Sequence, residues 1–174
     1  MIALLALEDG RVFRGESFGA KGTSTGEICF NTSMSGYQEI LTDPSYRGQI
    51  VAMTYPEIGN YGVNGLDVES DIPQVRGFVI EELSPVISSW RADCGLHEYL
   101  EKHGIPGSQG IDTRALTRHL RTRGAMKACI TTEITDEALA IEKAKSASYD
   151  GIDFVKEVST QANYEWDNQN SLSK

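Results

Sequence analysis

The sequence predicts an α+β domain with strands mainly in its first half and helices mainly in its second half. Short apolar runs bounded by Gly, Pro or Asn dominate the first half, a pattern typical of core strands. Apolar residues with helical spacing, together with capping residues, gather in the second half. Strands first and helices later favour an α+β architecture over a repeated βαβ array.

The chain opens with a predicted β-hairpin. Two apolar runs, 3–7 and 11–15, flank Asp9-Gly10, and this dipeptide favours a tight hairpin turn because Gly accepts a positive φ. Three further apolar runs are predicted to be core strands, at 27–31, 49–54 and 77–81. The glycine-rich segments between these runs are predicted to be loops.

A helix is predicted in the region of Leu96, Tyr99 and Leu100, whose spacing places them on one helical face. Gly104 follows as a stop residue, because Gly is favoured just beyond a helix C-terminus.

The next predicted helix has a complete set of end signals. Asp112 can cap its free N–H groups, and Ile111 and Leu116 occupy the two positions of a hydrophobic staple. Gly124 is predicted to end this helix.

A strand at 125–131 and a further helix capped by Thr135 complete the predicted domain. The first turn of that helix is acidic and its end carries lysines, which complements the helix dipole. From Ser159 onward the sequence is polar and has the composition of a linker. We therefore divide the chain into a domain at 1–152 and a linker or tail at 153–174.

The composition is typical of a globular protein without a membrane or nucleic-acid partner. The chain has 174 residues, with 25 acidic and 16 basic side chains and a net charge of −9, and such a field repels phosphate. No stretch approaches the roughly 20 apolar residues that a membrane-spanning helix needs. The 3 cysteines never form a Cys-x-x-Cys pair, so neither a disulfide framework nor a zinc site is indicated. These features predict a cytoplasmic protein that binds protein or a small molecule.

Several blocks of sequence occur in the order of a known family. The blocks span residues 31–46, 54–62, 89–92 and 110–118. From about Met1 to about Trp166, the chain resembles the amino-terminal domain of the small, glutamine-hydrolysing subunit of carbamoyl-phosphate synthetase. This resemblance implies a layered, swivelling β/β/α domain, and it ends where the family's glutaminase domain would begin.

The resemblance also implies the role of the chain. In this family, a glutaminase domain releases ammonia. The ammonia passes to a large subunit, which binds ATP and Mg and uses them in the synthesis. The parent heterodimer is a ligase that makes carbamoyl phosphate for pyrimidine and arginine biosynthesis. The present chain would be its non-catalytic domain, with no cofactor of its own and no activity alone. Its expected partners are the large subunit, the parent's glutaminase domain and glutamine.

Ser45 has two interpretations. Asp43-Pro44-Ser45 predicts a turn, because Pro presets φ and Asp can bond the backbone ahead of it. In the family that the chain resembles, the serine that matches Ser45 reaches the glutamine bound in the neighbouring glutaminase domain. A hydroxyl can donate to the carboxylate of glutamine or accept from its ammonium group. The sequence leaves both roles open.

Three arginines also have two interpretations. Arg114, Arg118 and Arg121 recur at spacings of four and three, which places them on one helical face, and Arg123 adds charge at the same end. A solvated face that complements the helix dipole is one explanation. The resemblance adds another, a docking surface for an acidic patch on the large subunit.

The remaining reactive side chains do not form a recognisable catalytic site. Class I glutaminases use a cysteine in a Gly-x-Cys-x-Gly context, which none of the cysteines has. The histidines lack metal-ligand spacing, so no metal site is predicted. Two alternatives from other classes remain. One is a stand-alone scaffold or regulatory module without enzyme activity, and the other is a thiol hydrolase that uses Cys94, which the missing base disfavours.

Overall fold

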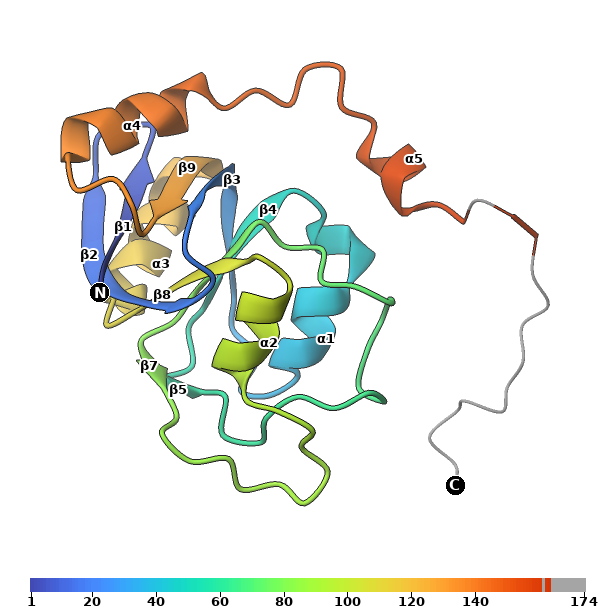
Figure 1. Ribbon diagram of the computed structural model, residues 1–174. Helices are drawn as coiled ribbons and strands as arrows, with labels where there is room; N and C mark the ends of the chain where they lie inside the picture. The colour runs from blue at the N-terminus through green and yellow to red at the C-terminus, as the bar shows by residue number, and fades with distance from the viewer. Residues whose placement is uncertain (161, 164–174) are drawn as a thin grey trace.

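Figure 1 shows the computed structural model, which describes residues 1–160, 162 and 163. Its central feature is a closed barrel with the strand order β1-β2-β8-β6-β4-β3-β9. The barrel strands are β1 (Ile2–Leu7), β2 (Val12–Gly19), β3 (Thr23–Asn31), β4 (Gln49–Met53), β6 (Gly77–Val79), β8 (Pro106–Gln109) and β9 (Met126–Thr131). Two short strands, β5 (Glu57–Ile58) and β7 (Glu82–Leu83), form a separate parallel pair.

The predicted hairpin and the predicted core strands are confirmed. Strands β1 and β2 pair antiparallel with Leu5 opposite Phe13, and Gly10 has a φ of 96° in the turn between them. Strand β4 pairs in parallel with both β3 and β6. The barrel is therefore a mixed sheet, with its antiparallel hairpin at the start of the chain.

The helices of the second half are also confirmed, with one correction at a cap. They are α2 (Leu96–Lys102), α3 (Thr113–Arg123) and α4 (Glu137–Ser146). Asp112 caps α3 by accepting from the Ala115 N–H at 2.7 Å. The prediction that Thr135 caps α4 is wrong, because Asp136 occupies that position and its carboxylate accepts from two N–H groups of the first turn.

One helix lies where the sequence predicted a loop. Helix α1 (Tyr37–Thr42) is only 6 residues long. Its N-cap residue is Gly36, which has no side chain to accept a hydrogen bond from the first turn. The hydroxyl of Tyr61 takes that place, accepting from the Gly36 N–H at 2.6 Å and from the Tyr37 N–H at 3.0 Å. This helix therefore depends on a residue distant in sequence, which local patterns cannot reveal.

The apolar side chains form separate clusters on the two faces of the barrel sheet. Successive residues of β1 alternate between them: Leu5 and Leu7 pack with Leu116 and Leu120 of α3, whereas Leu4 packs under α4. A third cluster lies beneath α1 and α2, which lie near each other on one side of the barrel in Figure 1. The structure is thus mixed α/β, with strands mainly in the first half and most helices later, while the layered swivelling arrangement stays a prediction.

The segment predicted to be a linker or tail contains a short helix, α5 (Phe154–Val158). The division of the chain at residue 152 stays a prediction, and the part of the tail from 164 lies outside the described residues. None of the helices within the described ranges has the length and apolar character needed to cross a membrane.

Candidate functional site

Ser45 lies in a short 3-10 turn, η1 (Pro44–Tyr46), directly after α1. Asp43 caps the turn, because its Oδ1 accepts from the Ser45 N–H at 2.8 Å. The Asp43 N–H in turn donates to the Glu39 carbonyl of α1 at 2.8 Å. The predicted turn is confirmed, and the Ser45 side chain is exposed. Its contact with glutamine stays a prediction.

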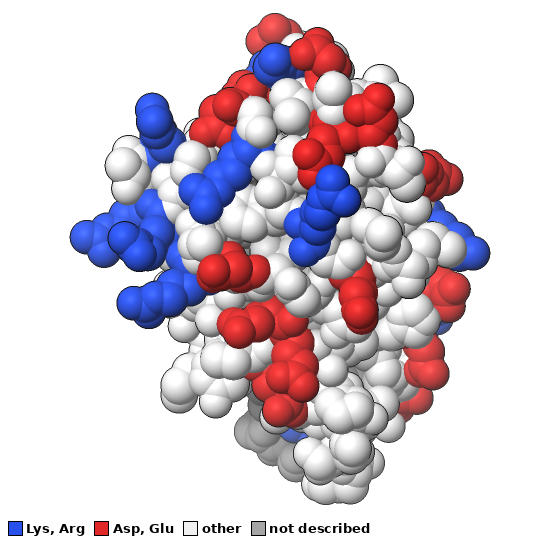
Figure 2. Space-filling view, turned by 90° about the vertical axis from the view of Figure 1, so that its left-hand side faces the viewer, with Lys and Arg blue, Asp and Glu red and all other residues white. Residues whose placement is uncertain are grey.

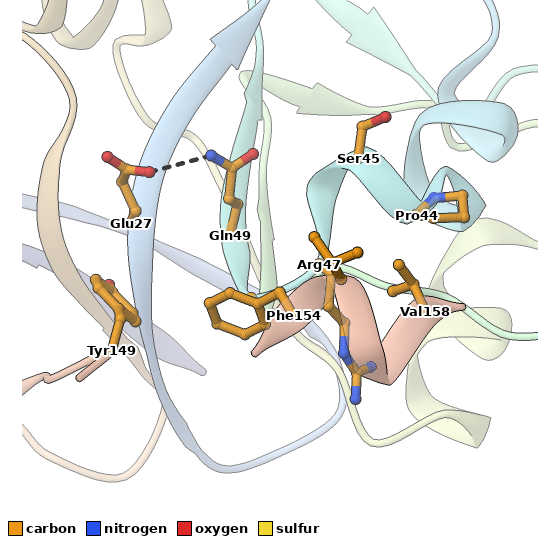
Figure 3. Close-up of a pocket in the computed structure, with 10 residues that line it drawn as sticks. Glu27, Pro44, Ser45, Arg47, Gln49, Tyr149, Phe154 and Val158 are labelled. Atoms are coloured by element: carbon orange, nitrogen blue, oxygen red, sulfur yellow. Dashed lines mark hydrogen bonds between the residues drawn. The ribbon is translucent and has the colours of Figure 1, made fainter. Parts of the chain in front are cut away.

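A surface pocket of about 510 Å³ adjoins this turn. It is lined by Glu27, Pro44, Ser45, Arg47, Gly48, Gln49, Tyr149, Phe154, Val155 and Val158. Figure 3 shows Phe154 and Val158 of α5 below the turn, with the Ser45 hydroxyl pointing away from them. Gln49 donates to the Glu27 carboxylate at 3.2 Å on the opposite side. The pocket therefore combines apolar walls with two charged side chains, and Ser45 lies at its rim.

The segments that carry the resemblance around Ser45 are largely explained by folding. The Tyr37 hydroxyl donates to the Gly62 carbonyl at 2.7 Å, and its ring stacks on Tyr61 with centroids 4.1 Å apart. Gln38 is fully buried, and its amide donates to the Asn64 carbonyl and accepts from the Asn64 N–H. These contacts fix α1 against the loop at 59–67, called the 60s loop below. Folding therefore accounts for these side chains without a ligand.

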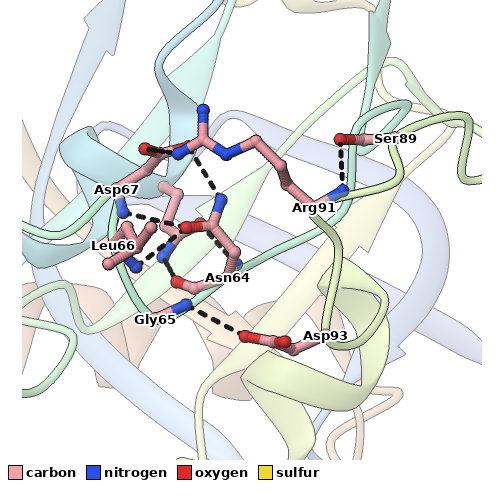
Figure 4. Close-up of polar contacts among 8 residues, drawn as sticks. Asn64, Gly65, Leu66, Asp67, Ser89, Arg91 and Asp93 are labelled. Atoms are coloured by element: carbon pink, nitrogen blue, oxygen red, sulfur yellow. Dashed lines mark hydrogen bonds and ion pairs between the residues drawn. The ribbon is translucent and has the colours of Figure 1, made fainter. Parts of the chain in front are cut away.

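A polar network next to this loop also has a structural role. Asn64 Oδ1 accepts from the Asp67 N–H at 3.0 Å, and its amide donates to Asp67 Oδ2 at 2.7 Å. Arg91 completes the network with an ion pair to Asp67 Oδ1 at 2.7 Å. Figure 4 shows these groups converging on Asn64 and Asp67 from two different loops. The network therefore ties the 60s loop to the segment that contains Ser89 and Arg91.

The arginine stripe is exposed on α3. Arg114, Arg118 and Arg121 are all exposed, whereas Leu116 and Leu120 of the same helix are buried. Figure 2 shows several basic side chains towards the left edge of the face that it draws, with acidic and further basic side chains scattered over a largely uncharged remainder. The arrangement agrees with the spacing in the sequence, and a docking role for the stripe stays a prediction.

A hollow of about 380 Å³ next to the stripe is lined by Arg118, His119 and Arg123, among others. His119 Nε2 lies 2.7 Å from Asp9 Oδ2, so this helix is linked to the hairpin turn. Burial raises the pKa of Asp9, but hydrogen bonds from the Arg11 N–H and His119 outweigh it and hold that pKa below its ordinary value. The predicted hairpin turn thus has a second contact that the sequence pattern did not reveal.

The three cysteine thiols lie in surroundings that raise their pKa. Burial, with Glu27 nearby, raises the pKa of Cys29 to about 11, and burial raises that of Cys129 equally. The pKa of Cys94 is also raised, by burial and then by Glu98 and Asp93. Because the thiolate is the reactive form, these environments oppose nucleophilic attack. The geometry therefore gives no support to a thiol hydrolase.

The histidines serve structural contacts. His97 Nδ1 accepts from the Gly19 N–H at 2.8 Å, which joins α2 to the end of β2. The ring of His103 lies against Tyr99 with centroids 4.7 Å apart. Over the part of the chain that the structure describes, no group of 3 or more His, Cys, Asp or Glu residues is placed to hold a metal ion.

Comparison with known proteins places this fold and these residues in a family. Residues 5–130 match the family model of the carbamoyl-phosphate synthase small chain, CPSase domain. The small chain from Akkermansia muciniphila is 59% identical over 91% of this chain and 42% of its own length. Those from Nostoc sp. and Yersinia pseudotuberculosis are 56% and 53% identical, over 95% and 94% of this chain and 43% and 42% of theirs.

Among solved structures, an aminopeptidase from Aneurinibacillus sp. strain AM-1 aligns with a TM-score of 0.38 and 12% identity, over 75% of this chain and 29% of that one. The present chain spans less than half the length of the curated relatives named above. The family match covers most of the barrel and includes η1 and α3. The chain therefore belongs to the carbamoyl-phosphate synthase small-chain family, through its CPSase domain.

Proposed function

We propose that this chain is the non-catalytic amino-terminal domain of a glutamine-dependent carbamoyl-phosphate synthase, completing the glutamine pocket with Ser45 and docking the large subunit through α3. Family membership supports the parent activity. The raised thiol pKa values support a non-catalytic role, because glutamine hydrolysis requires an activated nucleophile.

In this proposal the parent is a cytoplasmic heterodimer with ligase and glutamine amidotransferase activity. Its glutaminase domain releases ammonia, and its large subunit uses that ammonia with ATP and Mg to make carbamoyl phosphate for pyrimidine and arginine biosynthesis. The matched segment covers under half of each relative named above, which leaves room in a small chain for the glutaminase domain that the proposal requires.

The observation that carries the proposal is that the turn uses the Asp43 side chain and the Ser45 N–H, but not the Ser45 hydroxyl. The turn needs an acceptor for the Ser45 N–H, and the Asp43 carboxylate supplies it at 2.8 Å. Alanine at position 45 would keep the same N–H. The exposed Ser45 hydroxyl is therefore not needed to form the turn, and it can serve a ligand instead.

The test is Ser45→Ala in the complete two-subunit enzyme. Loss of a hydrogen bond to glutamine should remove about 0.5–1.5 kcal/mol of binding, or up to about 3 if a charged group of glutamine is left unpaired. The KM for glutamine should rise by roughly tenfold for each 1.4 kcal/mol lost. Synthesis from ammonia should be unaffected, because ammonia bypasses the glutamine pocket, and the melting temperature should not change.

Ser33→Ala is the matched control. Ser33 is also exposed, and its N–H also donates to a side chain two residues earlier, Asn31 Oδ1, at 2.8 Å. An unchanged KM for glutamine in Ser45→Ala would remove Ser45 from the site. Equal losses with glutamine and ammonia, accompanied by a lower melting temperature, would show that Ser45 has a purely structural role. The first result would leave the Ser45 hydroxyl without a role in glutamine binding.

A further inference from the structure

Helix α5 packs against the residues that immediately follow Ser45. Gly48 has a φ of +85°, and a Cβ built there would lie 2.6 Å from Phe154 Cζ. The Phe154 ring therefore occupies the space that a side chain at position 48 would fill. Figure 3 shows this ring beneath the η1 turn, between the helix and β4.

A second contact joins the same two segments. Arg47 Nε donates to Glu157 Oε2 of α5 at 2.9 Å. The Arg47 N–H donates to the Pro44 carbonyl at 3.1 Å, so Arg47 is also the C-cap residue of the η1 turn. The ion pair therefore connects α5 directly to the turn that presents Ser45.

These contacts account for the existence of α5. A helix of 5 residues is too short to be stable alone, because nucleation fixes several residues for few hydrogen bonds. Asp153 caps it by accepting from the Lys156 N–H at 3.0 Å, but a cap alone does not overcome nucleation. The packing of Phe154 on Gly48 supplies tertiary support, whereas Val155 at the next position is largely exposed.

We propose that α5 is a clasp that positions the chain leaving this domain relative to Ser45, with Phe154 and Glu157 as positioning residues for glutamine binding. This inference rests on the proposed function, in which Ser45 meets glutamine held by the domain that follows. A connecting segment fixed to the Ser45 turn itself orients the two halves of the pocket before the substrate arrives. Pre-organisation of this kind increases affinity because less motion is lost on binding.

The first arm of the test measures the clasp in the present chain. Phe154→Ala should accelerate hydrogen exchange at the Glu157 amide, which donates to the Asp153 carbonyl at 3.1 Å, on the order of tenfold. Val155→Ala is the matched control on the same helix, and it should leave this exchange rate unchanged. Equal exchange rates in wild type and Phe154→Ala would show that the ring does not hold α5, and would overturn the clasp.

The second arm measures glutamine kinetics in the complete enzyme. Phe154→Ala should raise the KM for glutamine several-fold, leave synthesis from ammonia unchanged, and be rescued in part by Phe154→Leu. Because the clasp acts through Ser45, Phe154→Ala should have little further effect in a Ser45→Ala background. An unchanged KM in Phe154→Ala, or an equal rise in both backgrounds, would overturn the clasp.

Comparing the glutamine KM of Ser45→Ala with that of Phe154→Ala separates the clasp from the proposed function. If Ser45→Ala leaves the KM unchanged, the proposed role of Ser45 fails, and the clasp fails with it as a device for glutamine binding. If Ser45→Ala raises the KM and Phe154→Ala does not, only the clasp fails.

Discussion

The Tyr61 hydroxyl is predicted to hold the start of α1 in place. It accepts from the Gly36 N–H at 2.6 Å and from the Tyr37 N–H at 3.0 Å, where Gly36 offers no side chain as a cap. Tyr61→Phe removes this acceptor and keeps the ring, whose stacking on Tyr37 at 4.1 Å and 19° should persist. The substitution therefore isolates the hydrogen bonds from the packing.

The magnitude follows from the two N–H groups. A buried donor left without a partner costs about 1–3 kcal/mol. Both bonds are only partly buried, so water can replace part of what is lost, and we expect the free energy of unfolding to fall by about 1–3 kcal/mol in total. For a domain of this size, that corresponds to a melting temperature lower by about 2–12 °C.

Urea and thermal unfolding followed by circular dichroism measure this change. Tyr55→Phe is the control, because Tyr55 is exposed and loss of its hydroxyl should change stability by less than about 0.5 kcal/mol. If Tyr61→Phe were equally neutral, the Tyr61 hydroxyl would not be the cap of α1, and the explanation given above for that helix would be refuted.

Two further predictions concern charged groups. Charge reversal of Arg118 and Arg121 should weaken association with the large subunit, more at low salt than at high salt, if the stripe docks an acidic patch; an unchanged dissociation constant for a folded double mutant would favour the solvated face. Asp9→Asn should lower stability at neutral pH, because the folded-state pKa of Asp9 lies below its ordinary value of 3.8. Burial raises this pKa, but hydrogen bonds from the Arg11 N–H and His119 lower it by more. That contribution is present above pH 3.8 and is lost as the pH falls through the folded-state pKa, so the urea midpoints of mutant and wild type should converge in acid. A difference that persisted in acid would assign the effect to something other than the carboxylate charge.

The parts of the fold that sequence patterns predicted are those with local causes. The hairpin follows from Asp9-Gly10, whose glycine adopts the positive φ that the turn requires. The start of α3 follows from Asp112, which accepts a hydrogen bond three residues ahead. In each case the residue that causes the structure lies within a few positions of the structure it causes.

The parts that sequence patterns missed have distant or competing causes. Helix α1 lies in a glycine-rich segment, and its acceptor is Tyr61, 24 and 25 positions beyond the donors. At α4, Thr135 and Asp136 are both good caps, and only the geometry shows that Asp136 accepts the bonds. Helix α5 has a local start signal in Asp153, but the contacts that support so short a helix come from residues distant in sequence.

The same distinction applies to the candidate site. Asp43-Pro44 predicts the turn locally, and the turn forms as predicted. The proposed role of Ser45 in binding glutamine came from the resemblance, because a turn signal in the sequence does not indicate which ligand an exposed hydroxyl would meet. The contact between Gly48 and Phe154 joins residues far apart in the sequence, so it could not have been predicted from either segment alone.

The Ser45 turn is held from both ends, and the two supports differ in kind. On one side, the Asp43 N–H donates to Glu39 of α1, a helix whose residues Tyr37 and Leu41 are part of the core. On the other side, Arg47 is held by α5 at the surface. Loss of the first support should therefore reduce global stability together with any glutamine affinity. Loss of the second should affect affinity with little change in stability, because exposed ion pairs and edge helices contribute little to global unfolding. A hydroxyl held in this way is positioned by folding before a ligand arrives, and the proposed contact with glutamine across two domains would depend on that positioning.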